Sequence, residues 1–200
     1  MHGKFTIATF RRRVPLVVAT TIVLLSLALY AMILSPQAIG ATTEYIVEII
    51  VFENDGSSDG GELWRETEGQ PPVGNAISLA NNDVKITELG ADQLELSGTA
   101  NILRRSGRYR ILTHKAWIQP GFTRKQAKNV RIRTESGWLD GTVRLESGRY
   151  LHLYLDFVYS PPVRFAGASS MRLKQRRRVR KRELHYFDHP RFSVLVMVRS

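Results

Sequence analysis

The most concentrated chemistry of the chain lies at residues 172–182, RLKQRRRVRKR, where eight of the eleven side chains are basic. Arginine carries a planar fork of N–H donors that fits carboxylates and phosphates. Short runs of this kind are typical of nuclear-localisation or nucleic-acid-binding segments. This segment, called the basic run below, is therefore the first candidate for a binding site.

The basic run also has a regular period. Apolar Met171, Leu173 and Val179 occupy odd positions, whereas every even position is cationic. A period of two is that of a β-strand with one charged face. The cations expected on that face are Arg172, Lys174, Arg176, Arg178, Arg180 and Arg182.

A second set of residues could perform acid–base or metal chemistry. His152 and Asp156 share one face of a predicted strand, Asp140 is expected opposite Asp156, and residues 185–190 add two histidines and an aspartate. Asp-His-Pro is also ordinary turn chemistry. The chain has no Gly-rich phosphate loop, nucleophile elbow or HExxH motif. We therefore expect no enzymatic activity, no metal site and no cofactor.

A predicted hairpin positions these side chains. Residues 139–146, LDGTVRLE, and residues 150–159, YLHLYLDFVY, each place apolar side chains on one face. Because opposed residues of an antiparallel pair share a face, Leu145 is expected opposite Leu151. This leaves Ser147-Gly148-Arg149 as a three-residue turn.

The outer face of the predicted hairpin carries aromatic side chains. Trp138, Tyr150 and Tyr154 could stack on sugar rings next to His152, or they could pack beneath a helix or loop. The pairs expected across this face are Arg144 with His152, Thr142 with Tyr154, and Asp140 with Asp156.

The remaining patterns complete an α+β domain. A long polar loop is expected at residues 54–90 and one main helix at residues 91–105. Further strands are expected at residues 44–52, 109–118, 130–133 and 192–198, the first of them buried and central. The fold class expected is α+β, a mainly antiparallel sheet of about six strands with one main helix.

Residues 1–41 resemble an export segment. Four basic residues precede an apolar run at residues 14–34, and small residues follow it. This pattern predicts either a signal peptide cleaved after Gly40 or Ala41, or an uncleaved membrane anchor. Both place residues 42–200, expected as a single domain, on the far side of the membrane in the periplasm, where nucleic acid is not the expected partner. The chain has no cysteine, which excludes disulfides and thiolate metal sites.

Charge is divided between two parts of the chain. Residues 44–95 hold twelve acids and two bases, and residues 101–200 hold 23 bases and six acids. The basic run could therefore bind an anionic partner, or it could be balanced by the acidic part. An anionic membrane surface or lipopolysaccharide is a third possibility. The basic run lies more than 130 residues from the apolar segment, which argues against a juxtamembrane anchor.

Four segments resemble the CsiV family of periplasmic proteins: YIVEIIVF, YRILTHKAWIQPG, LDGTVRLESGRYLHLYLDFVY and RRRVRKRELHYFDHPRFSVLVMV. The resemblance covers most of residues 44–200. It implies a non-enzymatic protein that binds peptidoglycan and helps an outer-membrane lipoprotein to activate a bifunctional penicillin-binding synthase.

We therefore predict a non-catalytic, peptidoglycan-binding periplasmic protein that supports cell-wall synthesis. The alternative is a periplasmic protein that binds an anionic membrane surface or lipopolysaccharide, and a wall hydrolase is less favoured. The predicted ligand-binding residues are the six cations of the basic run together with Tyr150, His152 and Tyr154.

Overall fold

The computed structural model describes residues 43–54, 70–79, 85–161 and 170–200. The predictions for residues 1–41 fall outside this part of the chain, as does most of the predicted loop at residues 54–90. Among the described residues, no helix is both long enough and apolar enough to span a membrane. Thr42–Ser200 form one compact unit.

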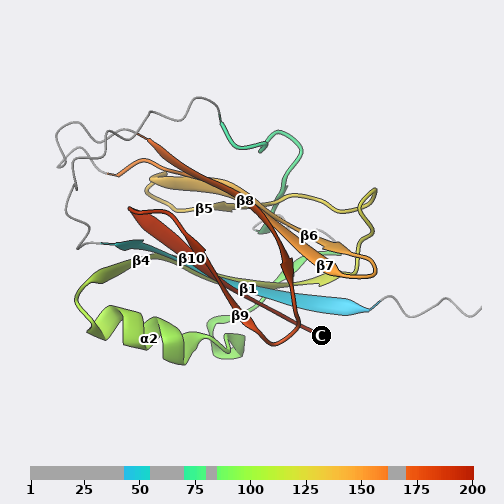
Figure 1. Ribbon diagram of the computed structural model, residues 1–200, viewed down its shortest axis with the longest axis horizontal. Coiled ribbons are helices and arrows are strands. Elements are labelled where there is room, and N and C mark those ends of the chain that lie inside the picture. The colour runs from blue at the N-terminus through green and yellow to red at the C-terminus, as the bar shows by residue number, and fades with distance from the viewer. Residues whose placement is uncertain (1–42, 55–69, 80–84, 162–169) are drawn as a thin grey trace, which may run out of the picture. The chain divides into compact units, whose positions relative to one another are not determined.

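The described strands form two five-stranded sheets that face each other (Figure 1). The first sheet has the order β3 (Thr87–Glu88), β4 (Tyr109–Pro120), β1 (Glu44–Asn54), β10 (Phe192–Arg199) and β9 (Leu184–Asp188). The second has the order β2 (Ile77–Ser78), β5 (Val130–Arg133), β6 (Leu139–Ser147), β7 (Leu151–Tyr159) and β8 (Met171–Val179). All strand pairs are antiparallel except β2 with β5.

The strand β1 is central because both of its faces are apolar. Val47, Ile49 and Val51 are fully buried between the sheets, where side chains of both sheets form the main core. Ile50 and Phe52 point the other way and join a second apolar cluster. The prediction of a buried central strand is confirmed.

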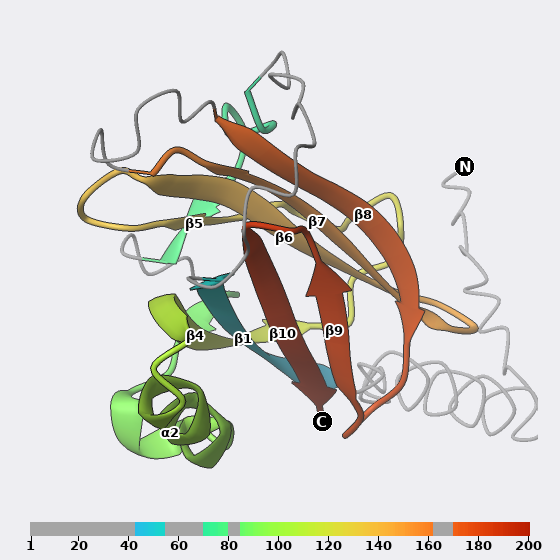
Figure 2. The same cartoon turned by 60° about the vertical axis from the view of Figure 1, so that its left-hand side comes forward.

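The helix α2 (Ser97–Arg105) covers the outer face of the first sheet, as Figures 1 and 2 show. Ala100 of this helix and Leu96, the residue that precedes the helix, pack on Ile50, Leu195 and Met197. Both apolar clusters use described residues of Thr42–Ser200 alone, so we expect this unit to fold without residues 1–41.

The helix is shorter than predicted. Residues 91–93 form a 3-10 turn instead of the first helical turn. The cause lies in β1, where the fully buried Glu48 carboxylate accepts the backbone N–H groups of Glu95 and Leu96 at 3.0 and 2.8 Å. These contacts satisfy N–H donors at the start of α2, and the helix begins at Ser97.

The hairpin of β6 and β7 forms, but in a different register. Leu145 lies opposite Leu153 and Ser147 lies opposite Leu151, so the three-residue turn is Gly148-Arg149-Tyr150. The predicted register was wrong by two residues. A shift of two keeps every side chain on its face, so the hydrophobic pattern could not distinguish the registers.

The basic run forms a strand only in its first part. The strand β8 ends at Val179, Lys181 bridges to Val198 of β10, and Arg182 has a positive φ of 61°. The chain then returns as β9, a strand that was not predicted. Between β8 and β9 the chain passes from the second sheet to the first. The prediction of a single strand from Arg172 to Arg182 was therefore wrong. The α+β class with antiparallel pairing and one main helix is confirmed, with two sheets in place of one.

Candidate ligand-binding cleft

The outer face of the second sheet carries a row of two cations and one aromatic ring. Arg144 of β6 and Arg176 of β8 lie opposite Tyr154 of β7 on its two sides. Their guanidinium carbons are 4.2 and 5.1 Å from the ring centroid, and the Tyr154 hydroxyl donates to Glu146 at 2.9 Å. Such cation–π contacts fix the ring and the guanidinium groups together. A sugar ring could stack on Tyr154 only by displacing a guanidinium.

An open cleft of about 600 Å³ lies beside this row. Thr142 and Asp156 contribute buried polar groups to it, and Pro72 and Asn129 line it from neighbouring loops. Its cationic lining consists of Arg144, Lys174 and Arg176. We call this feature the sheet-face cleft. Its charge and its exposed N–H donors suit carboxylate groups.

The Arg144 guanidinium contacts Glu146 through one terminal nitrogen, and its Nε makes no hydrogen bond to the described residues. Its terminal nitrogen lies 3.1 Å from the Glu146 carboxylate, and Glu146 is almost fully buried. The Arg144 Nε is buried and has no hydrogen-bond partner among the described residues. Buried donors are normally paired, so this nitrogen is an exception within the described part of the second sheet.

Arg172, the first cation of the basic run, is occupied. Its Nε and one terminal nitrogen donate to the two Asp156 oxygens at 2.7 and 2.8 Å. These bonds raise the pKa of the Arg172 guanidinium, although burial opposes them. Arg131 binds Asp140 in the same way at 2.9 and 2.6 Å.

The acid–base set is therefore not assembled. Asp156 faces Thr142 and Asp140 faces Val158, contrary to the predicted pairing of the two aspartates. Both carboxylates are engaged by arginines, and His152 lies between Glu146 and Arg178. The described residues contain no group of three His, Asp or Glu side chains that could hold a metal.

The last part of the basic run lies away from the sheet-face cleft. Tyr150 is in the hairpin turn, with the Arg178 guanidinium carbon 3.4 Å from its ring centroid. Arg180 and Arg182 are exposed in the turn between β8 and β9. The predicted binding residues thus divide into a cleft group and a group at one end of the sheets.

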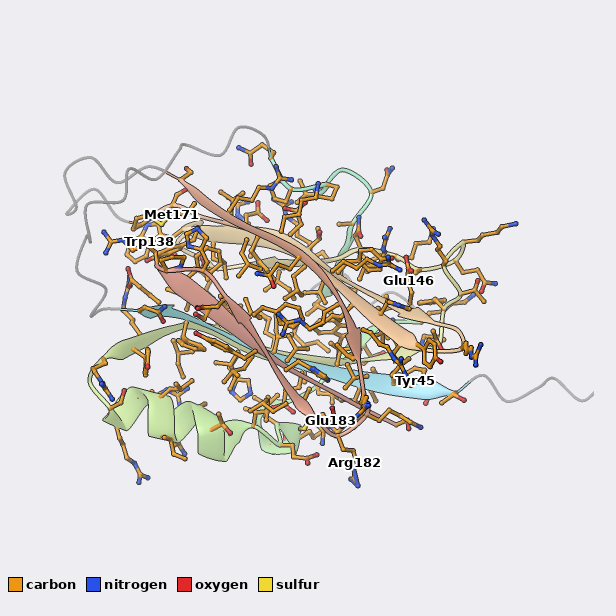
Figure 3. All side chains as sticks on the ribbon, viewed as in Figure 1. Tyr45, Trp138, Glu146, Met171, Arg182 and Glu183 are labelled. Atoms are coloured by element: carbon orange, nitrogen blue, oxygen red, sulfur yellow. The ribbon has the colours of Figure 1, made fainter. Side chains whose placement is uncertain are left out.

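One predicted position on this face was wrong, and one residue with specific contacts was not predicted. Trp138 was expected on the outer face, but it packs against the core between the sheets, 5.4 Å from Arg110. Figure 3 shows it at the end of the sheets opposite Tyr45. Arg177 was not predicted to matter, yet it donates to the Tyr186 carbonyl at 2.7 Å and lies over the Phe187 ring. With Gln175, which donates to the Asp188 carbonyl, it joins β8 to β9.

The described acids of residues 44–95 do not neutralise the basic run. Glu48 pairs with His114 and Arg199. The other pairs of this part are Glu53 with Arg110, Glu88 with Lys115, and Glu95 with Arg199. All of these partners belong to the first sheet. Within the described part of the chain, the acids of residues 44–95 therefore do not balance the cations of β8, and Arg172 pairs with Asp156 of β7 instead.

The fold and the cleft define the class: a two-sheet α+β domain with a cationic, tyrosine-containing cleft on one outer sheet face. The family follows from comparison with known proteins. The family described as "Peptidoglycan-binding protein, CsiV" matches residues 22–200. The chain belongs to this family, and the predicted resemblance is confirmed. No curated protein and no solved structure matches the chain.

Membership supports peptidoglycan as a partner. The family name describes binding and names no reaction, which suggests a binding protein and not an enzyme.

Proposed function

We propose that the protein binds peptidoglycan without catalysis and that the sheet-face cleft is the binding site. The observation that carries this assignment is the Arg144–Tyr154–Arg176 row beside Lys174 in the lining of the sheet-face cleft. The choice of peptidoglycan as the ligand rests on the description of the family.

The chemistry of the cleft suits the stem peptides of that polymer. Their free carboxylates match the guanidinium forks of Arg144 and Arg176. Thr142 offers a hydroxyl oxygen that could accept from amides or sugar hydroxyls. Each exposed ion pair is worth only about 0–1 kcal/mol, so firm attachment requires repeated contacts along the polymer.

The wider role rests on the sequence. The export pattern of residues 1–41 supports a periplasmic location, with an inner-membrane anchor if the segment is kept. The family resemblance supports a part in wall synthesis, in which the protein assists an outer-membrane lipoprotein that activates a bifunctional penicillin-binding synthase. Synthase rates measured with the lipoprotein, with and without this protein, test that role.

Sedimentation with isolated sacculi tests the binding site. Residues 42–200 are expected in the pellet at low salt, and Arg144→Gln/Arg176→Gln should release most of the protein. Arg104→Gln/Arg105→Gln on α2 is the matched control, because both side chains are exposed and distant from the cleft in the fold. Wild-type protein wholly in the supernatant would refute wall binding, and equal losses in both variants would refute the cleft. Release of soluble muropeptides, abolished by His152→Ala, would instead support a hydrolase.

A further inference from the structure

The fold gathers distant parts of the chain at one end of the two sheets. Glu44, the first residue of β1, lies opposite Pro120, the last residue of β4. Tyr45 contacts Ser147 next to the hairpin turn at 3.3 Å, and Lys181 bridges to Val198 near the end of β10. The start of β1, the turn after β6 and the turn after β8 therefore lie together (Figure 1).

This end carries a concentrated positive charge. Six exposed cations occupy its turns and loops: Arg124, Lys125, Arg149, Arg180, Lys181 and Arg182. We call these six residues the basic end. The exposed acids here are Glu44, Glu95 and Glu183, of which Glu95 lies 2.7 Å from Arg199 and Glu183 lies 3.4 Å from Arg180. Figure 3 shows the Arg182 side chain directed away from the sheets.

Apolar side chains flank the basic end. Tyr150 is 40% exposed and Leu184 is 48% exposed, two of the four large apolar side chains that are exposed in the described part of the chain; the others are Ile102 and Tyr186. Tyrosine is favoured where a membrane meets water, because its ring is apolar and its hydroxyl is polar. A surface that combines arginines, a tyrosine and a leucine is suited to lipid headgroups and the region just beneath them.

The path of the chain also favours a membrane. Nine residues, 35–43, separate the predicted apolar segment from Glu44, and Glu44 enters the domain at the basic end. An uncleaved segment would therefore join the domain at this end. Folding brings the end of the basic run close to the start of β1, although the two are far apart in sequence.

We propose that the basic end docks on the anionic phospholipid headgroups of the membrane that faces this domain. The basic end and the sheet-face cleft share no residue, so one protein could contact a lipid surface and its polymer at the same time. The proposal does not depend on the cleft being the peptidoglycan site.

Co-sedimentation of residues 42–200 with vesicles tests the docking. Vesicles of phosphatidylcholine with 30% phosphatidylglycerol should bind the protein, and pure phosphatidylcholine should not. High salt should weaken binding, because it screens exposed charges. Each cation near an anionic surface contributes roughly fivefold in affinity, so Arg180→Glu/Lys181→Glu/Arg182→Glu should weaken vesicle binding at least tenfold.

The matched control is Arg104→Glu/Arg105→Glu/Arg108→Glu. These exposed residues lie just before Tyr109, which is paired with Asn54 at the opposite end of β1, and the charge changes by the same amount. The control should retain vesicle binding, and both variants should retain sacculus binding and the unfolding temperature of the wild type. Equal loss in both triple variants, no loss in the first, or binding only to vesicles that contain lipopolysaccharide would overturn the proposal.

Discussion

Arg172 and Asp156 form a two-bond ion pair between β8 and β7, with both carboxylate oxygens engaged at 2.7 and 2.8 Å. Both side chains are largely buried. Arg172 was predicted to bind ligand and Asp156 was predicted to take part in acid–base chemistry. Because the two bind each other, neither is available for the predicted role. The pair therefore belongs to the framework of the second sheet.

We expect Arg172→Met to lower the free energy of unfolding by about 2–4 kcal/mol, because it leaves the Asp156 carboxylate buried without this partner. Lys174→Met, an exposed neighbour on the same strand, should change it by less than about 0.5 kcal/mol. Urea unfolding of both variants measures the difference. Similar midpoints for the two would show that the pair contributes nothing to the framework.

The Tyr154 ring holds Arg144 and Arg176 in place through its faces, while its hydroxyl only contacts Glu146. Tyr154→Phe should therefore keep most sacculus binding. Tyr154→Leu should weaken it at least fivefold, because the loss of two cation–π contacts of about 0.5–1 kcal/mol each releases both guanidinium groups. Pelleting at a series of sacculus concentrations distinguishes these outcomes. Equal affinity in the two variants would exclude a positioning role for the ring.

Glu48 should make the free energy of unfolding depend on pH in the acidic range. Burial raises the pKa of Glu48, but hydrogen bonds from His114, Leu96 and Glu95 outweigh burial, and the pKa ends below its ordinary value. The native state thus binds the Glu48 proton more weakly than the unfolded state. The resulting stability is present above the ordinary value near pH 4.3 and is lost as pH falls through the native pKa.

Glu48→Gln should cost about 2–4 kcal/mol at pH 7, because Arg199 loses a buried partner and the attachment of α2 is weakened. The difference from wild type should shrink below pH 4. Urea midpoints between pH 3 and 7 measure it. A difference that does not vary with pH would show that the Glu48 charge does not stabilise the native state.

Gly141 should tolerate no side chain. A Cβ there would lie 2.5 Å from the Asp156 carbonyl oxygen and 2.4 Å from the Phe157 ring. Gly141→Ala should therefore lower stability by about 2–3 kcal/mol. Gly148→Ala in the hairpin turn is the control, because its nearest neighbour is 4.0 Å away. Thermal unfolding compares the two, and a tolerated Gly141→Ala would contradict the close approach of β6 and β7.

Elements with a strong local pattern could be predicted from the sequence. β1 is apolar on both faces. β5 lies at its predicted bounds, although the residues around it are basic and poorly patterned. The start of α2 could not be predicted, since it depends on Glu48, about fifty residues away in sequence. The hairpin register could not be distinguished because a two-residue shift preserves the buried face.

The cationic face was predicted correctly for β8, where alternation determines which side chains point outward. The sheet-face cleft was not, because it needs Thr142, Arg144 and Asn129 from other strands and loops. The division of the basic run at Val179 depends on the crossing between sheets, and no local pattern encodes that crossing.

The contacts of Arg177 and Gln175 with β9 have a further consequence. An edge strand with unpaired carbonyls can pair with the edge of another molecule and start aggregation. Here the carbonyls of Tyr186 and Asp188 are already occupied by side chains of β8. Copies crowded along one polymer strand could therefore lie close together without pairing their sheets at β9, because Gln175 and Arg177 protect this edge while Lys174 and Arg176 line the sheet-face cleft.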